Sequence, residues 1–258
     1  MGKIIAITNQ KGGVGKTTTA INLSALLGSL GQRVLLADID PQGNATSGIG
    51  GEAGETSVYE ALLGRTPMTD AIRPTAWKGL DLAGGDIRLA GAELELVDLP
   101  RREFRLRQVL TAVRDRYDFI LIDCPPSLSL LTVNALAAAD TALIPIQCEY
   151  YALEGLSSLM STITRIQRSF NPKIAVEGIV LTMMDGRTKL SNQVAEEVRN
   201  HFRSKVYNVT IPRSVRLGEA PSHGEPIHVY DPRSTGALAY TVLAREFLAK
   251  NGARVKQA

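Results

Sequence analysis

The stretch Lys11-Gly12-Gly13-Val14-Gly15-Lys16-Thr17-Thr18 decides how this chain folds. It follows an apolar, strand-like segment at residues 4–7 and precedes a helix-like segment at residues 18–30. In such a setting the backbone N–H groups and the positive end of the helix dipole can hold phosphate groups. The stretch therefore predicts a phosphate-binding loop in an α/β fold.

Each residue type in this loop suits a nucleotide. Gly12, Gly13 and Gly15 let the backbone approach phosphate oxygens closely. We expect Lys16 to neutralise the β- and γ-phosphates and the hydroxyl of Thr17 to bind Mg²⁺. The predicted ligands are a nucleotide with β- and γ-phosphates and Mg²⁺, and the site includes the whole loop with Val14 and Thr18.

The loop departs from the usual phosphate-binding pattern at its start. That pattern needs a glycine at position 10, where this chain has Gln10, and a second lysine, Lys11, follows it. The arrangement resembles the deviant Walker A loop of the ParA/MinD class of ATPases. In that class the first lysine reaches the partner's nucleotide across a dimer interface, so the resemblance implies this catalytic role for Lys11. The alternative is that Lys11 is a solvated loop charge.

The composition is that of a globular protein. The chain has 258 residues, of which 44% are hydrophobic and 21% are charged, and we expect one domain over residues 1–258. Its longest apolar runs are far shorter than a membrane span, and its start lacks a signal-peptide pattern, so we expect a cytoplasmic protein. Cys124 and Cys148 are too few for a disulfide framework and are expected to be small buried residues.

The charge is distributed unevenly along the chain. Residues 187–258 contain 12 Lys/Arg against 6 Asp/Glu, which leaves 17 against 20 for residues 1–186. A basic C-terminal part is typical of a surface that binds a polyanion such as DNA, although charges spread over helix surfaces would only promote solubility.

Short apolar segments alternate with longer amphipathic segments along the chain. This alternation predicts a mainly parallel, twisted sheet flanked by helices. The expected strands are residues 3–8, 33–37, 80–83, 119–122, 142–146, 176–181 and 206–210. The expected helices are residues 17–30, 102–116, 153–169, 190–202 and 234–250. Residues 48–79 show no clear period, and we expect an irregular excursion there.

Acidic residues follow two of the expected strands. Asp38 and Asp40 come after one strand and Asp123 ends another, at the carboxyl edge where ligands of open α/β sheets collect. We expect Asp123 to hold Mg²⁺ through water, as a Walker B acid does, and Asp38 to support its loop. The alternative for Asp38 and Asp40 is that they only cap turns.

The loop, the acidic stretches and the segments 147–155 and 211–224 together resemble the chromosome-partitioning ATPases of the ParA/Soj family. The resemblance runs almost end to end and is weakest at residues 50–75. It implies an ATP-bound sandwich dimer that binds DNA without sequence preference, in the nucleoid. It also implies a ParB-type centromere-binding partner that stimulates hydrolysis, and an Asp40 that orients the attacking water near Mg²⁺. The chain begins at its first strand, so we expect no N-terminal helix-turn-helix domain.

The same resemblance assigns a DNA surface and a base site. Carried over residue by residue, it places Arg187 and Arg216 on the DNA surface, and Pro212 and Arg213 beside the adenine. Three further basic residues are candidates for that surface, although each can equally be a solvated charge: Lys189, Arg203 and Lys205.

Two other classes of protein share this loop. A membrane-associated cell-division ATPase like MinD binds lipid through a C-terminal amphipathic helix. Here residues 251–258 offer no bulky apolar side chain, and four apolar residues of the last helix are expected to pack on the core: Leu238, Val242, Leu243 and Phe247. An electron-transfer ATPase like the nitrogenase iron protein would share an iron–sulfur cluster through cysteines such as Cys124, and a colourless protein would exclude it.

Overall fold

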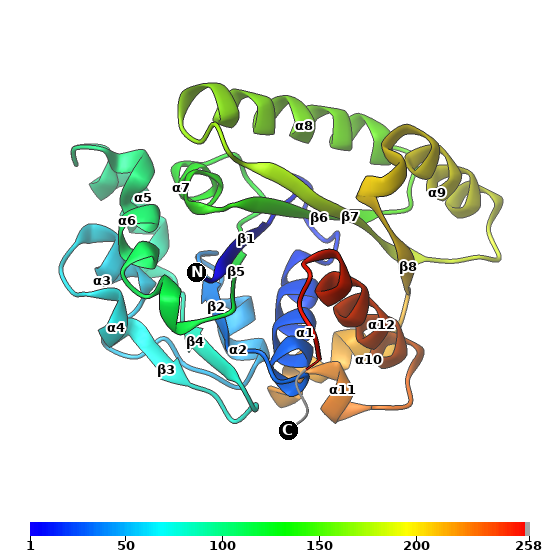
Figure 1. The fold of residues 1–258 in the computed structure, drawn as a ribbon, viewed down its shortest axis with the longest axis horizontal. Coiled ribbons are helices and arrows are strands. Elements are labelled where there is room, and N and C mark those ends of the chain that lie inside the picture. Colours follow the sequence, from blue (N-terminus) through cyan, green and yellow to red (C-terminus); the bar gives the residue numbers. More distant parts are fainter. Residues whose placement is uncertain (256–258) are drawn as a thin grey trace.

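The structure is a computed structural model and describes residues 1–255, in which an eight-stranded sheet is covered by helices on both faces (Figure 1). The strand order is β3-β4-β2-β5-β1-β6-β7-β8, and within these residues only β3 runs antiparallel to its neighbour. The strands are β1 (Lys3–Ile7), β2 (Val34–Asp38), β3 (Ile72–Pro74), β4 (Leu80–Ala83), β5 (Phe119–Asp123), β6 (Thr141–Gln147), β7 (Ala175–Met184) and β8 (Val206–Pro212).

Two hydrophobic cores lie on opposite faces of the sheet. In β1, Ile4 packs into one core and Ile5 into the other, because successive side chains of a strand point to opposite faces. One core is covered by α1 (Lys16–Ser29), α2 (Asn44–Gly48), α10 (Val215–Glu219), α11 (Ile227–Tyr230) and α12 (Thr235–Lys250). The other is covered by α3 (Val58–Leu63), α4 (Met68–Ala71), α5 (Arg88–Leu96), α6 (Arg105–Thr111), α7 (Leu130–Ala138), α8 (Ala152–Ser169) and α9 (Lys189–Phe202).

The predicted α/β class and mainly parallel sheet are confirmed, but the expected irregular segment 48–79 is wrong. It holds α3, α4 and β3, and α3 begins with a capping box. There the Ser57 side chain accepts a hydrogen bond from the N–H of Tyr59, and the Glu60 carboxylate accepts one from the N–H of Ser57. A serine followed three residues later by a glutamate was therefore the signal in the sequence.

The expected single helix over residues 102–116 is also wrong. Short 3₁₀ turns at Arg102–Phe104 and Arg114–Arg116 flank α6, which is only seven residues long. The side chain of Asn134 in α7 donates to the carbonyl of Arg102 and accepts from the N–H of Leu106. These bonds satisfy backbone groups at the start of α6, so a residue from a distant helix fixes where it begins.

The last long helix buries only two of the four apolar residues that were predicted to pack on the core. Leu243 and Phe247 are buried in α12, as expected, but Leu238 is 58% exposed and Val242 is 51% exposed. The buried positions recur every three or four residues from Ala237, which turns residues 238 and 242 toward solvent. Among residues 1–255, no helix has both the length and the apolar character needed to cross a membrane. Residues 256–258 of the predicted tail lie outside the described residues.

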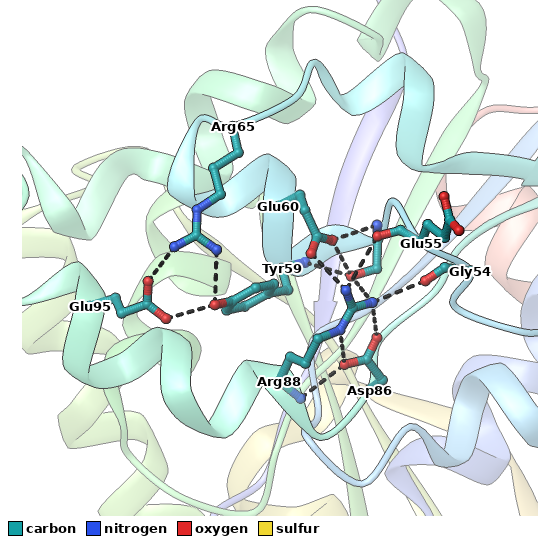
Figure 2. A network of polar contacts seen from close by, with 9 residues as sticks. Gly54, Glu55, Tyr59, Glu60, Arg65, Asp86, Arg88 and Glu95 are labelled. Carbon is teal, nitrogen blue, oxygen red and sulfur yellow. Dashed lines mark hydrogen bonds and ion pairs between the residues drawn. The ribbon is translucent and has the colours of Figure 1, made fainter.

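A polar network joins α3, α5 and the loop before α3 (Figure 2). The guanidinium of Arg88 donates to the carboxylates of Asp86 and Glu60 and to the carbonyls of Gly54 and Glu55, at 2.6 to 3.3 Å. One side chain therefore holds four groups from three segments.

Replacing Arg88 by alanine is expected to lower the free energy of unfolding by about 1–3 kcal/mol, because two carboxylates and two loop carbonyls lose a charged donor. Urea unfolding measures this change. Arg165→Ala, which removes an exposed arginine from α8, is the matched control and should change stability by less than about 0.5 kcal/mol. Equal stability of the two variants would show that the network of Figure 2 does not hold this region together.

Candidate nucleotide-binding site

The carboxyl ends of three neighbouring strands meet at one edge of the sheet. Asp123, the last residue of β5, pairs in register with Ile7 of β1 on one side and with Asp38 of β2 on the other. The glycine-rich loop leaves the sheet directly after β1, at the centre of the strand order. The sheet therefore brings the loop and both acidic stretches to one place, as the sequence predicts.

The loop is held in the conformation of a phosphate cradle. Gly13 and Gly15 have φ values of 73° and 87°, in the left-handed region that favours glycine. Gly15 also caps the amino end of α1. The first turn of α1 contains no acidic residue, so the free N–H groups of this turn are left to attract an anionic ligand. The carbonyl of Val14 accepts a hydrogen bond of 2.8 Å from the hydroxyl of Thr182, which fixes the loop to β7.

The two lysines of the loop lie in different surroundings. Lys16 is 6% exposed, and its ammonium donates to the carbonyl of Lys11 at 3.0 Å. Burial lowers the pKa of Lys16, and the nearby carboxylates of Asp123 and Asp40 oppose this change. A buried ammonium with one carbonyl partner is well placed for a polyanionic ligand.

The side chain of Lys11, unlike that of Lys16, is exposed. It is 46% exposed, and its ammonium lies 3.1 Å from one carboxylate oxygen of Glu149, whose other oxygen accepts a hydrogen bond from the side chain of Gln147. The backbone of Lys11 is held by Asn9, whose side-chain oxygen accepts its N–H at 3.0 Å. Lys11 is therefore an exposed cation on a fixed backbone.

Asp38 and Asp40 differ in their partners. The fully buried carboxylate of Asp38 accepts hydrogen bonds from the N–H and hydroxyl of Thr46 at 2.8 and 2.7 Å and from the N–H of Asp40 at 3.1 Å. Burial raises the pKa of Asp38 to about 6 despite these bonds. Asp38 thus holds its loop, as expected, and leaves Asp40 facing the cleft with a single bond from the N–H of Gln42.

Asp123 is a buried acid that lacks hydrogen-bond partners. It is 0% exposed, and neither carboxylate oxygen accepts a hydrogen bond from the residues that the structure describes. Burial and the neighbouring Asp38 raise its pKa well above the usual range. The hydroxyl of Thr17 is near enough to oppose this change without completing a bond, and Lys16 opposes it too.

These groups fit a magnesium ion that is bound together with a nucleotide. Within residues 1–255 no cluster of three or more His, Cys, Asp or Glu side chains could hold a metal alone. Mg²⁺ usually takes only one or two protein ligands and completes its shell with water and phosphate. Asp123, with two orphaned oxygens, and the adjacent Thr17 and Asp40 match that donor set.

Two adjoining clefts extend from the loop. A cleft of about 310 Å³ is lined by the loop and by Asp40, and a second of about 250 Å³ is lined by Pro212 and Arg213, beside α12. Gly15, Thr18 and Met183 line both. The predicted phosphate and base segments therefore adjoin. In the first cleft, the sequence prediction omitted four wall residues: Gln42, Asn44, Pro126 and Met183.

The predicted DNA-contacting residues fall into two groups. Arg187, in the turn after β7, and Arg216, in α10, leave the sheet at the same end, because Met184 of β7 pairs with Pro212 of β8. Lys189 begins α9 next to that turn. Lys205 lies before the first residue of β8, roughly 20 Å away along a seven-residue strand, so the fold does not bring it together with Arg187.

Both cysteines are buried, as predicted: Cys124 is 0% exposed and Cys148 is 5% exposed. Burial raises the pKa of both thiols, to about 11 for Cys148. Neither thiol therefore has the low pKa of a reactive cysteine.

A glycine-rich loop at a helix start, a buried lysine and a strand-end acid define the nucleotide site of a P-loop NTPase. Known proteins are similar to this chain over almost its whole length. A family described as an AAA domain matches residues 2–176. The "Sporulation initiation inhibitor protein Soj" of Bacillus subtilis (strain 168) is 58% identical over 254 residues, which cover 98% of this chain and 100% of the relative. The "Chromosome partitioning protein ParA" of Caulobacter vibrioides (strain NA1000 / CB15N) is 51% identical over 260 residues, covering 99% and 97%.

Among solved structures, cobyrinic acid a,c-diamide synthase from Mycobacterium smegmatis with a bound ATP analogue and magnesium has a TM-score of 0.84. It is 35% identical and covers 100% of both chains, so its identity is well below that of the partitioning proteins. The chain belongs to the ParA/Soj family of chromosome-partitioning ATPases.

Proposed function

We propose that this protein is a Mg²⁺-dependent ATPase whose ATP-bound dimer binds nucleoid DNA without sequence preference. A ParB-type centromere-binding partner stimulates hydrolysis and release, and the cycle segregates chromosomal or plasmid DNA in the cytoplasm. The observation that carries the proposal is the pair of lysines in one loop, of which one is buried beside its own cleft and the other is exposed. Family membership supports the same role.

The residues of the cleft suit phosphoryl transfer to water. This reaction needs charge neutralisation and a positioned nucleophile rather than covalent catalysis. Lys16 and the N–H groups of the loop bind the phosphates, and Asp40 orients the attacking water. Thr17 and Asp123 hold Mg²⁺, which neutralises charge on the phosphates when it is bound.

Lys11 supports a dimer in which each protomer completes the other's site. Its side chain is absent from the walls of its own cleft and is turned to solvent. A side chain built on Gly12 would meet nothing within 4 Å in its own chain, so this part of the loop is open to a second protomer. An exposed lysine supplied across a two-fold axis acts as an arginine finger does in other P-loop enzymes.

The DNA surface that we propose contains Arg187, Lys189 and Arg216, beside the base end of the cleft. Arg187 is 90% exposed and Arg216 is 54% exposed. Lys189 lies at the amino end of α9, where the helix dipole disfavours a cation, so it is not placed there to stabilise the helix. Lys205 and Arg203 remain predicted contacts for DNA that extends beyond this surface.

Binding to DNA duplexes of unrelated sequence tests this function. With Mg²⁺ and ATP we expect affinities that do not depend on sequence, exceed those with ADP by at least about tenfold, and fall with salt by a slope of roughly −0.9 per phosphate contact. Dimerisation doubles the number of contacts, which is the reason for the dependence on ATP. Equilibrium binding with labelled duplexes across a salt series measures all three properties.

Charge reversal at Arg187 tests where the DNA surface lies, separately from whether the protein binds DNA. Arg187→Glu is expected to weaken DNA binding with ATP by about ten- to a hundredfold while ATP-dependent dimerisation remains. Arg165→Glu on α8 makes the same change of charge elsewhere and should have a much smaller effect. Equal effects of both variants would move the DNA surface away from Arg187, and no binding by the unmodified protein would refute the DNA role.

A further inference from the structure

A short turn connects the nucleotide cleft with the proposed DNA surface. The hydroxyl of Thr182 donates to the carbonyl of Val14 in the phosphate-binding loop, and the next residue, Met183, lines both clefts. Arg187 follows only four residues later. Any displacement of Met183 therefore occurs only four residues before an arginine that we place on the DNA surface.

The backbone of this turn is constrained. Met183 has a φ of 50°, which is unusual for a residue with a long side chain and persists only where the surroundings enforce it. The pairing of β7 with β8 is irregular between Leu181 and Met184. Beyond it, the N–H of Arg213, which lines the base cleft, donates to the carbonyl of Met184 at 3.3 Å. The turn is thus held on both sides by residues of the nucleotide cleft.

At the end of the turn, Arg187 is paired with an acid of its own chain. The guanidinium donates from Nε to Oδ1 and from Nη2 to Oδ2 of Asp185, both at 2.9 Å. The N–H of Arg187 also donates to Oδ1, at 3.1 Å. The side-chain bonds from Arg187 lower the pKa of Asp185 to about 2, so this carboxylate is charged at neutral pH.

This ion pair occupies the atoms that would bind a phosphate. A guanidinium binds carboxylate and phosphate through the same planar pair of donors, so Asp185 and a DNA phosphate compete for Arg187. Because Arg187 is 90% exposed, its ion pair is weak enough for phosphate to displace the carboxylate.

We propose that Asp185 is a positioning residue that competes with DNA phosphate for Arg187, and that the turn from Met183 to Arg187 lets the bound nucleotide set the strength of this competition. The inference rests on the proposed DNA-binding function and adds to it a means of control. A nucleotide in the clefts that Met183 lines would lie against this side chain, and in this proposal ATP weakens the hold of Asp185 on Arg187 whereas ADP leaves it stronger. The nucleotide thereby acts on each protomer's own DNA contact, in addition to any effect of dimerisation.

Asp185→Asn is the variant that tests the competition. Asparagine keeps an oxygen for the N–H of Arg187, so the turn is retained, but it lacks the charge and the second acceptor oxygen. We expect DNA affinity to rise roughly two- to fivefold per protomer with ADP, the range for an exposed ion pair, and by less with ATP. The ratio of DNA affinities with ATP and ADP should therefore fall.

Glu196→Gln is the matched control. It removes one negative charge from the exposed surface of α9, close in sequence to the turn but outside it. We expect a smaller rise in DNA affinity that is equal with ATP and ADP. If Asp185→Asn behaves like Glu196→Gln, its effect is one of net charge alone and the inference is overturned.

Met183→Gly tests the connection to the cleft without altering any charge. Glycine tolerates the positive φ and frees the turn from the cleft wall. With saturating nucleotide, we expect the ratio of DNA affinities with ATP and ADP to fall, and an unchanged ratio would overturn the connection. Loss of binding in Arg187→Glu with no specific effect of Asp185→Asn would refute this inference alone, whereas no DNA binding by the unmodified protein would refute the proposed function as well.

Discussion

Replacing Lys11 by alanine is expected to reduce ATP hydrolysis by about 10³- to 10⁵-fold, the range measured for catalytic cations supplied by a partner in other P-loop enzymes. The affinity of the single protomer for ATP should remain within a fewfold of normal, because Lys11 does not line its own cleft. Lys16→Ala provides the contrast: Lys16 is buried beside the phosphate site, so its loss should remove ATP binding itself. A fluorescent ATP analogue measures affinity, and phosphate release measures turnover.

Mixing two inactive variants tests whether Lys11 acts across the dimer. Asp40→Ala lacks the residue that we expect to orient water, but it retains Lys11. When Lys11→Ala and Asp40→Ala protomers are mixed before ATP is added, half of the dimers are mixed, and each contains one complete site. Activity should therefore recover to at most about one quarter of normal for random pairing in a two-fold dimer.

The result separates two roles of Lys11. A mixture as inactive as its components, with mixed dimers confirmed by crosslinking, would place Lys11 in its own protomer's site. Normal turnover by Lys11→Ala alone would make Lys11 the solvated loop charge that its exposure and its ion pair with Glu149 also allow.

The centre of the site could be predicted because neighbouring residues in the sequence build it. The loop of residues 11–18 is continuous with β1 and α1, and Gly13 and Gly15 take positive φ values that glycine alone adopts easily. Asp38 and Asp123 each end a buried strand, and parallel strands place such residues at one edge. Local pattern and sheet geometry agree here, so the sequence is sufficient.

The walls of the site could not be predicted in this way. Met183 lines both clefts at the point where β7 pairs irregularly with β8, and that irregularity is a property of two strands separated by a helix. The start of α6 depends on Asn134, and the exposure of Leu238 depends on which face of α12 packs on the sheet. Each is decided by contacts between distant segments, so local periodicity gives no indication of it.

Asp123→Asn is expected to have opposite effects on activity and on stability. The buried carboxylate has no hydrogen-bond partner among the described residues, so its charge destabilises the fold when no cation is bound. Asparagine has nearly the same shape and no charge. In a chelating buffer at neutral pH, the variant should be more stable to unfolding by about 1–3 kcal/mol, because an unpaired buried charge costs more than an unpaired buried amide.

The gain in stability of Asp123→Asn over the unmodified protein should grow with pH. The pKa of Asp123 is raised in the folded protein, so between the usual carboxyl range and this raised value the folded state binds more protons than the unfolded state. Stability of the unmodified protein therefore falls as pH rises through this window, and the full cost is present above the folded-state pKa. The asparagine variant lacks this dependence, so the difference between the two in thermal unfolding should increase from pH 5 to pH 8.

Asp38→Asn is the control for this stability measurement. The carboxylate of Asp38 accepts hydrogen bonds from three donors, so asparagine would place an N–H₂ group against N–H and O–H groups and should destabilise the fold. In Asp123→Asn, Mg²⁺-dependent hydrolysis should fall by at least about 10²-fold, because charge neutralisation at the phosphates contributes several kcal/mol. A variant that is inactive but no more stable would show that Asp123 is compensated within the fold, and its orphaned oxygens would then no longer support a metal site.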